Sequence, residues 1–196
     1  NLLVYRTSIN KTNQKSNELP MPAWSQDFGA SDIRDYSSKP VVSFCGAITH
    51  PIRHKCIEKL KGSEDLENSF IIRNAFWGGN PHGKHIREEY KTNMKDSDLV
   101  LCCRGAGNFS FRLYEALSCG KIPIILDTDI SLPCDDVINW NNFIITTPES
   151  IVNDIKQWWR KMDNKSYAEI QRYSRSIYEN YLNPVGFAEY ISNSLK

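Results

Sequence analysis

A stretch with arginines and glycines near the middle of the chain carries the residues best suited to bind an anion. Arg104 and Gly105 are followed by Gly107, and then by Arg112 and Glu115. Glycines let a loop bend tightly and bring its backbone close to a ligand, and guanidinium groups donate paired hydrogen bonds to phosphate. The pattern predicts a site for an anionic ligand, and a phosphate-bearing nucleotide fits it best.

The elements expected around this loop form one strand–loop–helix–strand unit. Apolar runs predict strands at 99–102 and 122–126, and an amphipathic helix is expected at about 110–118. Asn108 or Ser110 can cap this helix, which leaves other N–H groups at its positive end free for a ligand. The alternative is an ordinary strand-to-helix turn in which Arg104 is simply solvated.

Arg112 and Glu115 stand three residues apart, so they share one edge of the predicted helix. The two side chains could form an ion pair with each other at little net energy. The functional alternative places Arg112 on a diphosphate and lets Glu115 accept hydrogen bonds from ribose hydroxyl groups. Spacing alone leaves both interpretations open.

A second strand–loop–helix passage with similar residues lies upstream. Gly46 opens its loop, Thr49 or His50 stands at the start of the helix, and Arg53 falls on the first turn. The carboxyl ends of parallel strands lie along one edge of a doubly wound sheet, so this loop and the Arg104 loop open on the same side. Arg53 is therefore a second phosphate-binding candidate, unless it is a solvated helix residue.

The chain as a whole reads as an α/β protein with a Rossmann-like, doubly wound parallel sheet and C-terminal helices. Its expected strands are short, apolar and not alternating, and helices of about ten residues separate them, as in a sheet covered on both faces. Residues 1–39 are expected to be an irregular segment or linker with one strand at 2–5 and a polar run at 10–22, ahead of a domain at 40–196. The further strands are expected at 41–44, 70–73 and 143–145, and the further helices at 51–60, 86–95, from Pro148, at 166–181 and from Pro184 to about 195.

Bulk properties exclude several classes of protein. The 196 residues suit one domain, and a net charge of +1 provides no basic field for nucleic acid or an acidic membrane surface. No apolar run approaches the roughly 20 residues of a membrane span. The cysteines fall in or beside expected core elements, so we expect free thiols, and a sequon at Asn108 would put a glycan on the expected ligand loop. We therefore expect the cytoplasm or another reducing compartment.

Two other motifs in the chain bear on a metal site and on a dinucleotide site. Pairs of histidines occur at zinc-like spacing, but no H-E-x-x-H or paired C-x-x-C motif accompanies them, so we expect no metal. Gly105-x-Gly107-x-x-Ser110, with Asp127 after the next strand, imitates a dinucleotide fingerprint, although its third glycine is a serine. That alternative predicts an NAD-dependent oxidoreductase with Asp127 on a ribose.

The central motif resembles the exostosin family, glycosyltransferase family 47. The family's donor-binding half carries a pattern close to P-R-G…S-F-R-x-x-E-A-L…P-V-[VI]-L…L-P…V-I-N-W, preceded by S-F-x-G…R. The resemblance spans about 40–148 and rests on Ser43-Phe44, Gly46, Arg53, Arg104-Gly105, Ser110-Phe111-Arg112, Glu115-Ala116-Leu117, Pro123-Ile-Ile-Leu126, Leu132-Pro133 and Val137-Ile-Asn-Trp140.

This resemblance implies the nucleotide-sugar-binding donor half of a GT-B glycosyltransferase, whose two Rossmann-like halves face each other across a cleft. It implies an inverting, metal-independent transfer of a sugar from a UDP-sugar to a glycan hydroxyl, with no cofactor. Arg53 and Arg112 would compensate the charge of the departing diphosphate, and Glu115 would hold the ribose. The donor-site residues expected on this basis are Gly46, Arg53, Arg104, Gly105, Ser110, Arg112 and Glu115.

The chain departs from the family pattern in three respects. Cys103 stands where the family has a proline, no membrane anchor is apparent, and about 39 residues precede the donor half. We expect 1–39 to be the remnant of an acceptor half that was removed or is vestigial. Such a compact form would suit a viral or microbial member, with a small donor sugar such as xylose or galactose. The alternative to an enzyme is a non-catalytic sugar-nucleotide-binding subunit. The alternative location is the Golgi lumen, if a missing N-terminus carries an anchor.

The sequence does not identify the general base that an inverting transfer needs. Such a base must come within about 3 Å of the acceptor hydroxyl. Trp77, beside two glycines, could stack on a sugar or a base, or simply anchor its loop. Candidates for the base by residue type alone are Asp27, Asp32, His50, His82 and His85.

Overall fold

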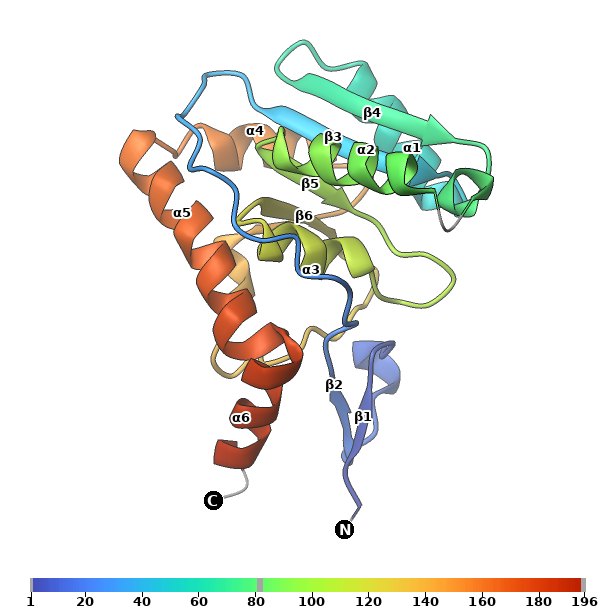
Figure 1. Cartoon of the computed structure of the whole chain (residues 1–196), viewed down its shortest axis with the longest axis vertical. Coiled ribbons are helices and arrows are strands. Elements are labelled where there is room, and N and C mark those ends of the chain that lie inside the picture. Colours follow the sequence, from blue (N-terminus) through green and yellow to red (C-terminus); the bar gives the residue numbers. More distant parts are fainter. Residues whose placement is uncertain (1, 81–82, 195–196) are drawn as a thin grey trace.

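A five-stranded parallel sheet forms the centre of the computed structural model, which describes residues 2–80 and 83–194 (Figure 1). Its strand order is β4-β3-β5-β6-β7, and each neighbouring pair is parallel. The strands are β3 (Val41–Ala47), β4 (Glu67–Arg73), β5 (Leu99–Cys102), β6 (Ile122–Leu126) and β7 (Ile144–Thr146). The doubly wound α/β fold expected from the sequence is confirmed.

Helices cover both faces of the sheet. α2 (Lys84–Lys95) packs on β3, and α3 (Phe111–Ser118) packs on β5 and β6, in front of the sheet in Figure 1. α1 (Pro51–Lys61) and α4 (Ile151–Trp159) contact each other behind it. α5 (Asn164–Ile177) lies against α3 and continues into η4 (Tyr178–Leu182) and α6 (Pro184–Ser194). These two layers explain why β5 and β6 are apolar and buried along their whole length.

The strand order reverses between β3 and β5. From β3 the chain passes through α1 to β4 on one side, whereas β5 begins the run toward β7 on the other side. Loops that leave two such strands at their carboxyl ends diverge, and a crevice forms between them. The loop that follows β3 and the loop that precedes Arg112 emerge at this place. Gly46, expected from the sequence to open the first of these loops, lies within β3.

The N-terminal segment is more ordered than its composition indicates. β1 (Val4–Arg6) and β2 (Glu18–Pro20) form a parallel pair, with the single-turn η1 (Lys11–Asn13) between them. The expectation that 10–22 is an irregular run is therefore wrong in part. A three-residue strand that ends in a proline carries too little periodicity to be recognised. Asn10 forms an isolated bridge with Ile130, which ties the segment to the loop after β6.

Two C-terminal helices begin at other residues than expected. The helix expected from Pro148 begins at Ile151, because the residues before it first form a turn. The helix expected at 166–181 begins at Asn164, where Asp163 and Ser166 form a capping box, and its last part widens into the π-helical η4. Helix ends are fixed by caps and turns, which leave a weaker trace in a sequence than the apolar period does.

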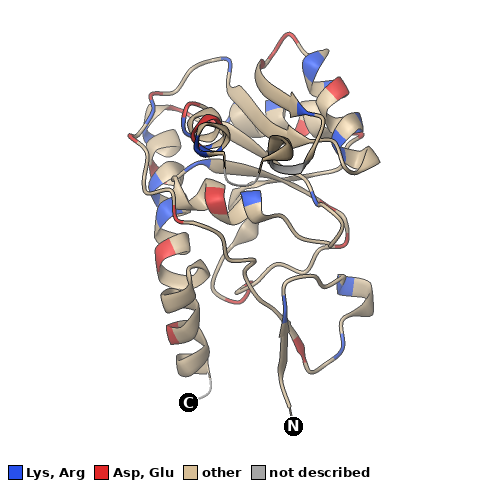
Figure 2. Cartoon of the chain, turned by 45° about the vertical axis from the view of Figure 1, so that its right-hand side comes forward, with Lys and Arg blue, Asp and Glu red and all other residues tan. Residues whose placement is uncertain are grey.

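Charged residues of both signs are spread over the molecule. Figure 2 shows lysines and arginines interspersed with aspartates and glutamates along the helices. All six cysteines are buried as free thiols. Within residues 2–80 and 83–194, no helix is long and apolar enough to cross a membrane.

Candidate functional site

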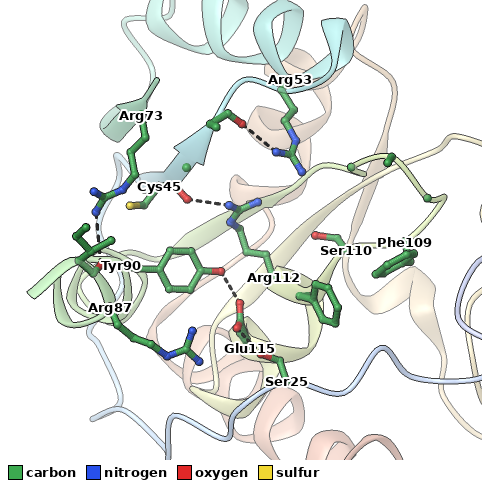
Figure 3. Close-up of a pocket in the computed structure, with 17 residues that line it drawn as sticks. Ser25, Cys45, Arg53, Arg73, Arg87, Tyr90, Phe109, Ser110, Arg112 and Glu115 are labelled. Atoms are coloured by element: carbon green, nitrogen blue, oxygen red, sulfur yellow. Dashed lines mark hydrogen bonds between the residues drawn. The ribbon is translucent and has the colours of Figure 1, made fainter. Parts of the chain in front are cut away.

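A cavity of about 370 Å³ opens at the carboxyl ends of β3 and β5, where the strand order reverses. Its walls come from the end of β3, the first turn of α1, the loop before α3, the start of α3, α2 and the N-terminal segment (Figure 3). Ligands of doubly wound sheets bind at such a reversal point. Six of the seven residues expected at the donor site line this cavity, namely Gly46, Arg53, Gly105, Ser110, Arg112 and Glu115.

Arg112 lies deep in the cavity wall and is only 9% exposed. Its Nη2 donates to the carbonyl oxygen of Cys45 at 2.8 Å, and its guanidinium carbon lies 4.5 Å from the ring centre of Phe44. Burial lowers the pKa of Arg112, but nearby groups, with Tyr90 the strongest, raise it above its ordinary value. The side chain is therefore charged, and its buried Nε has no acceptor within the described part of the chain.

Arg53 reaches the same cavity from the first turn of α1. Its Nε donates to the carbonyl oxygen of Arg104 at 3.0 Å, and its Nη1 donates to Ala47 O at 2.9 Å and to Thr49 Oγ1 at 3.1 Å. Burial lowers the pKa of Arg53, and the positive charge of Arg112 lowers it further. The two guanidinium groups therefore repel each other, and an anion bound between them would remove that repulsion.

Two glycines leave room for these guanidinium groups. A Cβ added at Gly46 would meet Nη2 of Arg112 at 3.0 Å, and a Cβ added at Gly105 would meet Nη2 of Arg53 at 3.4 Å. Gly46 also has a φ of +152°, which L side chains rarely adopt. Glycine is thus needed at position 46 for the close approach of Arg112, whereas a Cβ at position 105 would make ordinary van der Waals contact with Arg53.

Glu115 is bound by two hydroxyl groups and does not pair with Arg112. Ser25 Oγ donates to its Oε1, and the Tyr90 hydroxyl donates to its Oε2. Burial raises the pKa of Tyr90 well above its usual value, and the Glu115 carboxylate adds to this, so the phenol keeps its proton. The Arg112–Glu115 ion pair that their spacing allows is not among the contacts of the described residues.

The loop before α3 is held by Asn108. Its Nδ2 donates to Asn10 Oδ1 at 2.7 Å and to Thr128 O at 2.9 Å. Ser110 occupies the N-cap position but makes no side-chain cap hydrogen bond, so the expectation that Asn108 or Ser110 caps the helix is wrong. The first N–H groups of α3 therefore lack a side-chain acceptor from either residue, and they add positive potential at the cavity.

Arg104 does not line the cavity. Its Nη2 donates to the carbonyl oxygen of Ala106 at 3.3 Å, while its own carbonyl oxygen accepts from Arg53. Arg104 therefore supports the site through its backbone. Sequence reasoning could not distinguish the two roles, because neighbouring residues in a loop point in different directions.

None of the described candidates for a general base lines the cavity. Asp27 forms an ion pair with Arg175 at 2.7 Å, and His50 caps α1 by accepting from Ile52 N at 3.2 Å. An ion pair and a helix cap are contacts that stabilise the fold, and neither places its side chain in the cavity. The remaining two described candidates, Asp32 and His85, are exposed.

The remaining expectations from the sequence concern His82 and Trp77, a dinucleotide site at Asp127, and a metal site. His82 and the side chain of Trp77 lie outside the described residues. Asp127 is exposed after β6 and does not line the cavity, so the arrangement gives no support to a dinucleotide site with Asp127 on a ribose. No group of three or more metal-ligating side chains occurs in the described ranges.

Sequence reasoning missed four polar side chains of the cavity wall, namely Ser25, Arg73, Arg87 and Tyr90. Arg73 ends β4, and its ion pair with Glu89 joins that strand to α2. An arginine at the carboxyl end of a predicted strand, beside the reversal point, is a signal that could have identified Arg73. Arg87 and Tyr90 share a helix face at a spacing of three, which is a weaker signal.

Comparison with known proteins identifies the family of this chain. The Exostosin GT47 domain model matches residues 2–162. The chain belongs to the exostosin GT47 family. The family expected from the central motif is confirmed, and the match reaches back from 40 into the N-terminal segment.

The relatives of this GT47 chain are distant and longer. An exostosin-1 homolog of Caenorhabditis elegans is 27% identical over 102 residues, which cover 52% of this chain and 27% of that protein. A protein named "Probable glycosyltransferase" from Arabidopsis thaliana is 23% identical over 137 residues, which cover 69% of this chain and 24% of that protein. The GT47 chain thus spans about a quarter of the length of these relatives.

Two solved structures share its fold. Anabaena HepE, solved with UDP and glucose, has a TM-score of 0.55 at 14% identity and covers 98% of this chain and 62% of its own. An S. aureus TarM mutant, solved with fondaparinux, α-GlcNAc-glycerol and UDP, has a TM-score of 0.54 at 14% identity and covers 92% of this chain and 40% of its own. The GT47 chain therefore has an α/β fold of the type found in GT-B glycosyltransferases.

Proposed function

We propose that this GT47 chain binds a UDP-sugar in the cavity and serves the donor side of an inverting, metal-independent sugar transfer to a glycan hydroxyl. The observation that carries the proposal is the pair of arginines, Arg53 and Arg112, at the carboxyl ends of β3 and β5. A diphosphate offers several acceptor oxygens, and guanidinium groups bind such oxygens in pairs. Each arginine is already oriented by backbone carbonyl groups, so little ordering would accompany binding.

The same arginines suit the chemistry of the departing group. When the bond between the sugar and the diphosphate breaks, negative charge grows on the phosphate oxygen that leaves. Preorganised cations in a site with little water stabilise such charge strongly. Arginine can supply here the positive charge that a divalent cation supplies in other nucleotide sites, which supports a metal-independent transfer.

The rest of the cavity suits a nucleoside. Phe109 and Phe111 pack edge to face at 5.2 Å, and Phe111 is 51% exposed. Such rings offer an apolar wall on which a base or a sugar ring can pack. The structures of HepE and the TarM mutant, which were solved with UDP bound, support a uridine nucleotide as the ligand. For the transferred sugar we propose a small one, such as xylose or galactose.

A second candidate is a sugar-nucleotide-binding subunit without turnover of its own. It is favoured by one observation, since the only carboxylate among the described lining residues is Glu115, which two hydroxyl groups already bind. A base that removes the acceptor proton would then come from another chain or domain. Binding of UDP-sugar without release of UDP, in the presence of glycan acceptors, would favour this candidate.

Calorimetric titration of the chain with UDP, UDP-xylose, UDP-galactose, UDP-glucuronate and NADH tests the proposal. We expect UDP to bind with a Kd that EDTA does not change, and we expect one UDP-sugar to bind more tightly than the others. If the chain binds no UDP, or prefers NADH, the proposal fails. A Kd that rises strongly in EDTA would disprove metal independence alone.

A further inference from the structure

A strap formed by residues 23–28 crosses α3 and reaches the cavity. Ala23 and Phe28 are buried at 2% and 4% exposure, and the backbone N–H of Phe28 donates to Ser118 Oγ on α3 at 3.1 Å. Between these two anchors, Ser25 turns toward the cavity and donates to Glu115 (Figure 3). The strap has no helix or strand, so its position depends on these side-chain contacts.

Tyr90 approaches Glu115 from α2, on another side of the carboxylate (Figure 3). Its ring packs edge to face against Phe28 of the strap at 6.0 Å, and the guanidinium carbon of Arg112 lies 5.6 Å from its centre. Tyr90 therefore contacts the strap, the carboxylate and the anion-binding arginine. Two elements that are far apart in the sequence, the strap and α2, thus determine where Glu115 of α3 points.

The two hydroxyl donors leave a defined part of the carboxylate unused. An ionised carboxylate has about four acceptor positions, two on each oxygen. Ser25 uses one position on Oε1, and Tyr90 uses one on Oε2. One position therefore stays open on each oxygen. Two neighbouring hydroxyl groups, as on a ribose ring, are the ligand that matches two such acceptors side by side.

The family resemblance already implies that Glu115 holds the ribose. We propose that Ser25 and Tyr90 are positioning residues, which aim the Glu115 carboxylate so that both of its oxygens accept from the two ribose hydroxyl groups. The inference rests on the proposed UDP binding and deepens it. On this inference the strap contributes to the donor site through Ser25. The arginines, which act on the diphosphate, do not depend on the diol, so the two parts of the ligand can be tested separately.

The test compares UDP with 2′,3′-dideoxyuridine diphosphate, which keeps the base and the diphosphate and lacks both ribose hydroxyls. Calorimetry gives the Kd of each ligand for the unaltered chain and for Ser25→Ala and Tyr90→Phe. For the unaltered chain we expect UDP to bind at least about tenfold more tightly than the dideoxy analogue. In each variant we expect the Kd of UDP to rise about three- to tenfold while the Kd of the analogue stays constant.

Tyr167→Phe is a matched control. Tyr167 is fully buried on α5, and its hydroxyl donates to the buried carboxylate of Asp98 at 2.7 Å, outside the cavity. The control removes the same kind of contact and should leave the ratio of the two Kd values unchanged, even if its melting temperature falls.

Three outcomes overturn the inference in distinguishable ways. If Ser25→Ala and Tyr90→Phe weaken both ligands equally, the two residues act on the cavity as a whole and do not aim the carboxylate. If the unaltered chain binds UDP and the analogue equally well, Glu115 does not bind the diol, although the proposed function survives. If the unaltered chain binds neither, the proposed function fails and the inference fails with it.

Discussion

Replacing Arg112 with methionine separates a ligand-binding role from a structural one. The guanidinium is almost fully buried, donates to Cys45 O at 2.8 Å and keeps an unpartnered Nε within the described part of the chain. Methionine retains much of the length of the side chain and a favourable contact with the rings of Phe44 and Tyr90. We expect Arg112→Met to weaken UDP binding strongly while the stability of the ligand-free protein hardly changes.

The two magnitudes come from different interactions. Removing one partner of a buried, hydrogen-bonded charge pair costs about 2–5 kcal/mol of binding, which raises Kd by roughly 30-fold to several thousand-fold. In the ligand-free protein, methionine loses one charged hydrogen bond of about 1.5–3 kcal/mol and the attraction of the aromatic rings, about 1–2 kcal/mol. It also removes the penalty of a buried charge, which is several kcal/mol, so the free energy of unfolding should change by no more than about 1 kcal/mol.

Calorimetry with UDP and urea unfolding without ligand measure the two effects. Asp127→Ala is the control for binding, because Asp127 is exposed and lies outside the cavity. Its Kd for UDP should stay within about twofold of the unaltered value. The reasoning would be refuted if Arg112→Met lowered the free energy of unfolding by several kcal/mol and left the Kd unchanged, because Arg112 would then be a structural residue.

Three further predictions follow from single groups. Gly46→Ala should raise the Kd of UDP about tenfold, because its Cβ would meet the guanidinium at 3.0 Å, whereas Gly62→Ala, with its nearest neighbour at 3.7 Å, should not change the Kd. Lys121 is 1% exposed, and burial lowers its pKa from 10.5 to about 8. Lys121→Met should therefore raise the free energy of unfolding at pH 7 by up to about 3 kcal/mol. Since the folded state releases this proton first, the unaltered protein should gain stability as pH rises from about 8 to 10.5 and Lys121→Met should not, as urea titrations at several pH values can check. Burial raises the pKa of Asp27, but the hydrogen bonds from Arg175 and from the Gly29 N–H, together with the nearby positive charges of Arg175 and Lys95, outweigh burial, and the net pKa lies below 3.8. The stabilisation from Asp27 is thus present above pH 3.8 and lost as pH falls through the folded pKa, so Asp27→Asn should flatten the acid side of the melting curve against pH.

The parts of the molecule that the sequence predicted well are those in which neighbouring residues determine the structure. β5 and β6 have the expected bounds, 99–102 and 122–126, because continuous apolar runs between polar or glycine-bearing loops are typical of buried parallel strands. Arg53 and Arg112 were placed together by one topological rule, that the carboxyl ends of parallel strands share an edge. That rule needed only the element order, which the apolar pattern supplies.

The contacts that the sequence did not predict join residues far apart along the chain. Ser25 and Glu115 are 90 positions apart, and nothing in the aperiodic run around Ser25 shows that an irregular strap packs on α3. The predicted side-chain cap of α3 is absent for a related reason. Asn108 forms a hydrogen bond with Asn10 of the N-terminal segment and does not cap the helix. The local sequence indicates which hydrogen bonds a side chain is able to form. The packing of distant segments determines which of those bonds it forms in the folded protein.

The electrostatics of the cavity connect its folding to its ligand. The whole chain has a net charge of only +1, yet the described cavity wall contains four arginines beside the single carboxylate of Glu115. Arg73 has Glu89 as a counter-ion, whereas Arg53 and Arg112 bond to neutral carbonyl groups and repel each other. That repulsion destabilises the ligand-free fold, and the proposed diphosphate ligand would remove it. On the proposed function, such a site gains affinity from charge that the fold has already brought together, while Ser25 of the strap and Tyr90 orient the carboxylate that would bind the uncharged ribose.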